Sequence, residues 1–149
     1  MNKKVPLLTA MCGAILVIIA ATYVYKNNTV NNKTSLLTYK GKEWTLSKVI
    51  LADGSTLLPK GKIPFTFTLK EDMTLHGAAD CNGYFGAPVV INGNIVKMSV
   101  LATTKIGCGD SEGNAKFTTY LEKAVSYKIQ SDTLIFETFD KSQLFFILN

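Results

Sequence analysis

The chain has 149 residues, of which 47% are hydrophobic, and a formal net charge of +5. This length provides one hydrophobic core but not two. Lysines among the first 33 residues supply most of the net charge, so the rest of the chain is close to neutral. There is no arginine, the side chain that most often reads phosphate and guanine. The basic balance therefore does not indicate nucleic-acid binding, and we expect no nucleic-acid partner.

An uncharged, mostly apolar run extends from Val5 to Tyr25, and lysines flank it on both sides. A membrane-spanning helix needs roughly 20 such residues, and lysines in front of it favour an N-terminus in the cytoplasm. The sequence therefore predicts a cytoplasmic segment over residues 1–4 and a transmembrane anchor over residues 5–25. We expect an inner-membrane protein of the bacterial cell envelope, with its C-terminal domain outside the cytoplasm.

Two alternatives to a retained anchor stay open. Ile19-Ala20-Ala21 resembles the small-residue site at which a signal peptide is cleaved, and cleavage would leave a secreted or periplasmic protein. Cys12 suggests a lipoprotein signal, although Met11 is larger than the residue that normally precedes a lipidated cysteine.

The segment after the apolar run differs from the rest of the chain. Residues 26–39 are rich in Asn and Thr and have little to bury, which predicts a flexible linker. The folded domain is then expected over residues 40–149.

Alternation of apolar and polar residues predicts antiparallel strands in this domain. Asn92-Gly93-Asn94 and Ser131-Asp132 suit the turns of two hairpins. The predicted strands lie at residues 44–47, 65–69, 73–76, 89–91, 95–98, 125–129, 134–136 and 144–148. The last strand is strongly apolar and makes a poor sheet edge, because bare edges invite aggregation. We predict a mainly β (α+β) domain: a partly open antiparallel β-barrel of about seven to nine short strands with one α-helix.

The helix is expected to begin near Asp110 or Ser111, which can cap it, and Glu112 suits the positive end of its dipole. Its apolar face is formed by Phe117, Leu121, Ala124 and Val125. We expect this face to pack on the sheet.

Cys81 and Cys108 are the only cysteines of the predicted domain. Because an exported domain meets an oxidising compartment, they are expected to form a structural disulfide. Two reduced buried thiols, or a redox or metal role, are the alternatives. Two cysteines and one histidine are too few for a tetrahedral zinc site, so we expect neither a metal nor a cofactor.

His76 is the single histidine, and no nucleophile motif accompanies it. Asp80, Asp110 and Glu112 would approach one another if the cysteines pair, which suggests a weak calcium site; helix capping by Asp110 is the simpler interpretation. We therefore expect no catalytic residues.

Several ordered motifs resemble those of the META domain family, the family of the heat-shock protein HslJ. Asp80-Cys81-Asn82-Gly83-Tyr84-Phe85-Gly86 is similar to its Gly-Cys-Asn-x-aromatic-x-Gly signature. The segment from Leu101 to Cys108 is similar to its Ser-Thr-x-Met-Ala-Cys segment. The further matching residues are Trp44, Thr103, Thr104, Glu112 and Phe117. The chain departs from the pattern at Asp80, which replaces a glycine, and at Ile106-Gly107.

The resemblance implies an exported, envelope-associated domain with a cracked antiparallel barrel similar to lipid-binding secretion pilot proteins. Relatives are linked to heat shock, antibiotic resistance and motility or secretion. No catalytic residues are established for the family. The resemblance also implies that Cys81 and Cys108 pair and that Asn82 and Gly83 form a turn.

These features together predict a non-catalytic envelope protein, involved in stress response or in envelope or secretion assembly. We expect it to bind a protein partner or an apolar ligand such as a lipid. A weak hydrolase that uses His76 and a purely structural envelope domain are the alternatives.

Overall fold

The computed structural model describes residues 35–61, 63–106 and 111–149. The predicted anchor over residues 5–25 lies outside the described residues. Within the described residues, no helix is both long enough and apolar enough to cross a membrane.

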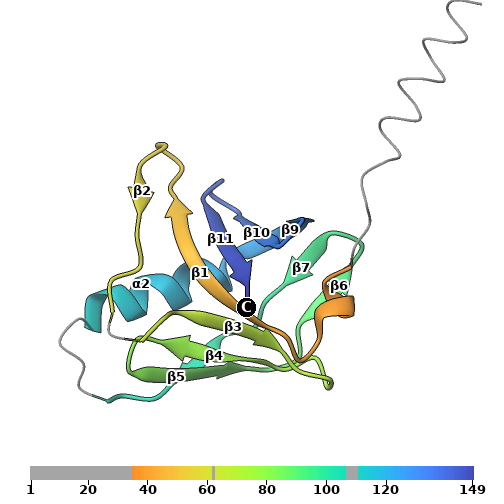
Figure 1. Cartoon of the computed structure of the whole chain (residues 1–149), viewed down its shortest axis with the longest axis horizontal. Helices are drawn as coiled ribbons and strands as arrows, with labels where there is room; N and C mark the ends of the chain where they lie inside the picture. Colours follow the sequence, from red (N-terminus) through yellow and green to blue (C-terminus); the bar gives the residue numbers. More distant parts are fainter. Residues whose placement is uncertain (1–34, 62, 107–110) are drawn as a thin grey trace, which may run out of the picture. The chain divides into compact units, whose positions relative to one another are not determined.

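The described residues form one antiparallel sheet and one α-helix, α2 (Ser111–Glu122). The strands are β1 (Glu43–Ile50), β2 (Thr56–Leu57), β3 (Thr66–Leu69), β4 (Leu75–Ala79), β5 (Asn82–Gly86), β6 (Val90–Asn92), β7 (Ile95–Lys97), β8 (Leu101–Thr103), β9 (Ala124–Gln130), β10 (Thr133–Thr138) and β11 (Gln143–Leu148). Their order is β6-β7-β9-β10-β11-β1-β3-β4-β5-β8, and β2 pairs with β1 beside this path. The sheet curls into a half-barrel (Figure 1), as the sequence predicts in outline.

The predicted number of strands is wrong, because the described residues contain eleven. The three strands that alternation did not reveal are β2, β5 and β8. β2 has two residues and β8 has three, too few to show a period. β5 contains Gly83 and Gly86, and glycines in a strand suggest a turn or bulge when only the sequence is read.

β1 is the strand that organises the sheet, because it pairs with three others. Its first residues pair with β3, its last residues pair with β2, and β11 lies along its other edge. The register against β11 shifts between Leu46 and Lys48, which is a β-bulge and bends the strand. Beyond the bend, the end of β1 and the paired β2 extend away from β3, β4 and β5 as an arm (Figure 1).

Aromatic side chains fill the core of the half-barrel. Trp44, Phe67 and Phe136 have no exposed surface, and the rings of Phe67 and Phe136 lie 5.2 Å apart. From α2, Phe117 stacks on Phe65 with a centroid separation of 5.0 Å. The helix therefore packs on the sheet, as predicted. The apolar strand β11 lies between β10 and β1, so its edges are covered.

The helix ends earlier than predicted. Ala124 and Val125 belong to β9 rather than to α2. Ala124 is buried and Val125 is exposed, the alternation of a strand. Apolar spacing alone did not separate the last helical turn from the strand that follows it.

The folded domain also begins earlier than predicted. A 3-10 helix, η1 (Leu36–Tyr39), falls within the predicted linker. Leu36 is fully buried and its N–H donates to the Tyr127 hydroxyl over 3.1 Å. The Tyr39 ring lies 5.1 Å from that of Trp44. The predicted linker is therefore wrong for its last residues, since two apolar side chains within a polar segment reach the core.

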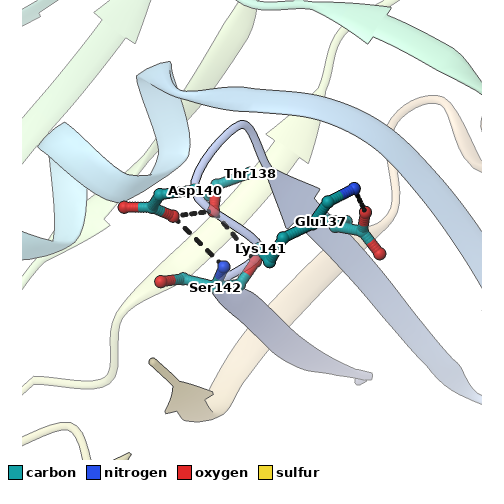
Figure 2. Close-up of polar contacts among 5 residues, drawn as sticks. All are labelled: Glu137, Thr138, Asp140, Lys141 and Ser142. Atoms are coloured by element: carbon teal, nitrogen blue, oxygen red, sulfur yellow. Dashed lines mark hydrogen bonds and ion pairs between the residues drawn. The ribbon is translucent and has the colours of Figure 1, made fainter. Parts of the chain in front are cut away.

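The turn between β10 and β11 is closed by a compact set of polar contacts (Figure 2). Asp140 Oδ1 lies 2.5 Å from Thr138 Oγ1 and accepts from the Ser142 N–H over 3.1 Å. These hydrogen bonds, chiefly the one with Thr138, hold the pKa of the Asp140 carboxyl below its usual value. Lys141 forms an exposed ion pair with Glu137 at 3.0 Å. The contacts are local, so we interpret this cluster as the closure of a hairpin.

Candidate functional site

A half-open pocket of about 240 Å³ lies between the β1–β2 arm, the loop after β2 and helix α2. We call it the arm pocket. Its lining residues are Leu46, Val49, Leu57, Leu58, Pro59, Lys60, Phe65, Lys116, Phe117 and Tyr120. Most of the lining is apolar, two residues are basic and none is acidic.

The bulge in β1 produces part of the pocket wall. Residues three apart on a regular strand point to opposite faces of the sheet. The register shift places one extra residue between Leu46 and Val49, and both side chains are only 4% exposed. Both therefore face inward and line the pocket. No motif in the sequence marks this bulge, so the pocket was not predicted.

The rim of the pocket carries both apolar and basic side chains. Leu57 is 39% exposed and Leu58 is 65% exposed, which is costly in water for residues of this size. Lys60 and Lys116 are exposed and line the pocket, where lysine stems can cover apolar surface.

Asp80 holds the loop that carries part of this lining. Its side chain is buried, and its Oδ1 accepts from the Ile63 N–H over 3.4 Å. Gly61 approaches so closely that a Cβ there would lie 2.9 Å from Asp80 Oδ1. The backbone of Asp80 has a φ of 56°, a left-handed conformation that Asp, Asn and Gly adopt most readily. Asp80, one of the departures from the family pattern, thus connects the β4–β5 turn to the loop between β2 and β3.

The weak calcium site that the sequence offered as an alternative falls mostly outside the described residues. Asp110 and the side chain of Glu112 lie outside the described residues. In the described part of the chain, no group of three metal-ligating side chains occurs.

Asn82 joins β5 to the chain that leaves β8. Its Oδ1 accepts from the Ile106 N–H over 2.7 Å and from Thr104 Oγ1 over 3.0 Å, and its Nδ2 donates to the Ile106 carbonyl over 3.3 Å. Thr104 Oγ1 in turn accepts from the Gly83 N–H over 3.1 Å. Asn82 and Gly83 begin strand β5, so the prediction that they form a turn is wrong. The residue with positive φ in that turn is Asp80.

The remaining motif residues are distributed over the half-barrel. Trp44 is fully buried, and among the described residues its Nε1 has no hydrogen-bond partner. Thr103 is exposed on β8 opposite Tyr84. A Cβ on Gly86 would lie 2.8 Å from Leu101 Cδ2, so a larger residue there would have to displace that side chain. Phe117 is the one motif residue that also lines the arm pocket.

The cysteines are only partly described. Cys81 Sγ lies 3.7 Å from the Ile106 carbonyl oxygen, and Cys108 lies outside the described residues. The disulfide therefore stays a prediction.

His76 is exposed on β4, with its ring centroid 6.4 Å from that of Phe85. Among the described residues, no hydrogen bond orients its imidazole. A general base needs a partner that orients it and a nucleophile within reach.

The fold and its contacts define a small, mainly β half-barrel with one helix across it and a side-chain amide that fastens β5 to the end of β8. The profile of the META domain family matches residues 35–149. The chain therefore belongs to the META domain family.

Solved structures share this fold. A protein from Burkholderia xenovorans, solved by NMR, is 18% identical with a TM-score of 0.67, and the match covers 79% of this chain and 88% of that one. A second protein solved by NMR is 20% identical with a TM-score of 0.59, covering 77% and 95% of the two chains. A DUF4847 family protein from Bacteroides vulgatus is 19% identical with a TM-score of 0.55, covering 74% and 94%. No curated protein matches the chain.

Proposed function

We propose that this META domain is a non-catalytic binding module that takes an apolar group into the arm pocket. The observation that carries the proposal is the pocket itself, with buried Leu46 and Val49 in its wall and exposed Leu57 and Leu58 at its rim. Covering exposed apolar surface stabilises a complex by roughly 25 cal/mol for each Å² removed from water. A ligand that covers the two rim leucines thus gains affinity without any hydrogen bond.

The size of the pocket restricts what it holds. Pockets for drug-sized ligands usually measure roughly 300–1,000 Å³, and the arm pocket is smaller at about 240 Å³. It suits a short alkyl chain or a single apolar side chain rather than a whole lipid.

A non-catalytic role is supported by the exposure of His76 and by the lack of an orienting hydrogen bond from the described residues. We further propose that the domain lies outside the cytoplasm of a bacterial cell, tethered by residues 5–25, and serves stress response or envelope or secretion assembly. The support is the apolar run with its lysine flanks and the approach of Cys81 to Ile106, two residues before Cys108.

The binding proposal is tested on residues 35–149. This fragment is expected to fold by itself, because the core lies within it and the matched structures consist almost wholly of this fold. Titration with 1-octanol, followed by NMR of the backbone amides, should give saturable shifts at Leu46, Val49 and Phe117. Shifts that scatter over the surface, or that never saturate, would refute the pocket and favour a purely structural domain.

A pair of variants makes this test specific. Leu57→Glu places a charge on the rim and should weaken octanol binding at least about fivefold, because the tail loses apolar cover. Val90→Glu is the control, since Val90 is 62% exposed on β6, an end strand of the sheet that borders neither β1 nor β2. Equal weakening in both variants would contradict the assignment of the pocket.

A further inference from the structure

We propose that the hairpin of β6 and β7 docks on the surface of the membrane to which the chain is tethered, with the side chains of Val90 and Ile95 among the lipid head groups. This inference rests on the proposed tether over residues 5–25 and not on the arm pocket. The hairpin forms one end of the sheet. Val90 is 62% exposed and Ile95 is 59% exposed, so the hairpin displays apolar surface to water.

The register of the hairpin places both side chains on one face. Val90 pairs with Lys97, and in the next pair of that face Asn92 lies opposite Ile95. Residues opposite each other in an antiparallel pair point to the same side, and side chains alternate along each strand. Val96 therefore points to the other face, where it is buried in the core with 2% exposed. The stem of Lys97 can cover apolar surface while its ammonium group reaches the head groups.

The start of the folded domain is fastened to the turn of this hairpin. The Tyr127 hydroxyl accepts from the Leu36 N–H over 3.1 Å and donates to the Gly93 carbonyl oxygen over 2.9 Å. The Tyr127 N–H also donates to the Asn94 carbonyl oxygen over 2.9 Å. Figure 1 shows η1 next to the hairpin. The chain therefore enters the domain beside the hairpin turn.

The length of the tether keeps this entry point close to the bilayer. Residues 26–35 join the apolar run to Leu36, and a chain of that length spans at most about 35 Å. Within this reach a weak contact becomes favourable, because the local concentration of membrane surface is high. Covering the apolar side chains of the hairpin supplies such a contact. Leu37, which is 42% exposed in η1, adds to the surface that can be covered.

Charge contributes little to this contact. Residues 81–109 contain no acidic side chain that would repel anionic lipid. The β3–β4 turn, which bonds to the chain just before β6, contains two acidic residues. Its Glu71 forms an ion pair with Lys40 at 3.0 Å, and its Asp72 is exposed. We therefore expect neutral and anionic head groups to serve almost equally.

The test uses the full chain in lipid nanodiscs, with one copy in each disc. The discs are made of phosphatidylcholine, with or without phosphatidylglycerol. A small share of the lipid carries a paramagnetic head group, which broadens the NMR signals of amides near the surface. We expect the broadening to be strongest at Gly93 and Ile95 and to be similar in the two kinds of disc.

A double variant tests the two apolar side chains. Val90→Ser combined with Ile95→Ser should lower the ratio of docked to undocked domain about tenfold, because the face loses its apolar cover. Phe139→Ser is the control, since Phe139 is 84% exposed in the β10–β11 turn. It removes a larger apolar side chain outside the hairpin and should leave the ratio within about twofold.

The outcomes separate the docking from the tether on which it rests. A full chain that does not stay in the discs would overturn the proposed anchor, and the docking with it. An anchored chain with uniform broadening, or with the strongest broadening in another region, would overturn the docking alone. Equal effects of the double variant and of Phe139→Ser would also overturn it. Concentration-dependent shifts at the hairpin of residues 35–149 without lipid would assign this face to a second copy instead.

Discussion

The side-chain amide of Asn82 replaces a backbone peptide group where the pairing of β5 with β8 ends. It offers one donor and one acceptor to the Ile106 peptide, at 3.3 and 2.7 Å, as a neighbouring strand would. Aspartate lacks the donor, and glutamine places the same group one methylene farther from the backbone. The position therefore requires asparagine, which is a physical reason for the Cys-Asn pair in the family motif.

Gly77 is a residue whose importance the sequence did not reveal. A Cβ there would lie 2.1 Å from the Thr66 carbonyl oxygen and 2.5 Å from the Tyr84 ring. That ring cannot retreat, because it is buried and its hydroxyl donates to the same carbonyl. We predict that Gly77→Ala lowers the free energy of unfolding by about 3 kcal/mol, as overpacking does, measured by urea denaturation.

Gly83 provides the matched control for that measurement. A Cβ on Gly83 would meet only the Gly77 carbonyl oxygen at 3.9 Å, an ordinary contact. Gly83→Ala should therefore change stability by less than about 1 kcal/mol. Equal losses at both glycines would show that backbone freedom, rather than the contact with Tyr84, sets the requirement.

At the scale of elements, the bulge in β1 decides what the domain can bind. Alternation predicted this strand and its start at Trp44, but it cannot predict that Leu46 and Val49 point to the same side. The register shift that aligns them exists only in pairing with β11, which is distant in sequence. The same reason explains why β8 and β5 were missed: their strand character comes from their partners and not from their own composition.

The loop after β2 is the second element that shapes the pocket, and its Ile63 N–H donates a hydrogen bond to Asp80. We predict that Asp80→Gly, which restores the usual family residue and tolerates the positive φ, frees this loop. Hydrogen exchange at the Ile63 amide should become about tenfold faster, and octanol binding should weaken about threefold, since a lost hydrogen bond is worth about 1 kcal/mol.

Asp80→Asn distinguishes the hydrogen bond from other effects of the substitution. Asparagine keeps an oxygen acceptor for Ile63 and also tolerates the left-handed backbone. In the Asp80→Asn variant, the rate of hydrogen exchange at the Ile63 amide should stay within about threefold of the rate in the unmodified domain. Exchange as fast as in Asp80→Gly would mean that the acceptor does not hold the loop.

For the whole molecule, the sequence predicted the class of fold and most of the strands, because these depend on the local alternation of apolar and polar residues and on the residues of the turns. It placed the apolar strand β11 inside the sheet from the cost of exposing such an edge. It missed the start of the domain, because Leu36 and Tyr39 are held there by contacts with Tyr127 and Trp44 that the sequence pattern does not show. The pocket was missed for a similar reason, because its lining comes from three separate segments.

The last prediction concerns the whole chain, with its three cysteines and its N-terminal segment. Full-length protein is made in bacterial cells, denatured with and without reductant, and labelled with a maleimide polymer that adds a countable mass to each free thiol. A retained anchor with an oxidised domain leaves only Cys12 free before reduction, so we expect one label without reductant and three labels after reduction.

The other outcomes would identify the alternatives. A cleaved signal removes Cys12 and gives no label without reductant and two labels after reduction. A lipidated Cys12 also gives no label without reductant and two labels after reduction, but the protein then carries the added mass of the lipid. Three labels without reductant would mean that Cys81 and Cys108 are reduced thiols, and both the disulfide and the location outside the cytoplasm would have to be abandoned, since an oxidising compartment pairs such cysteines.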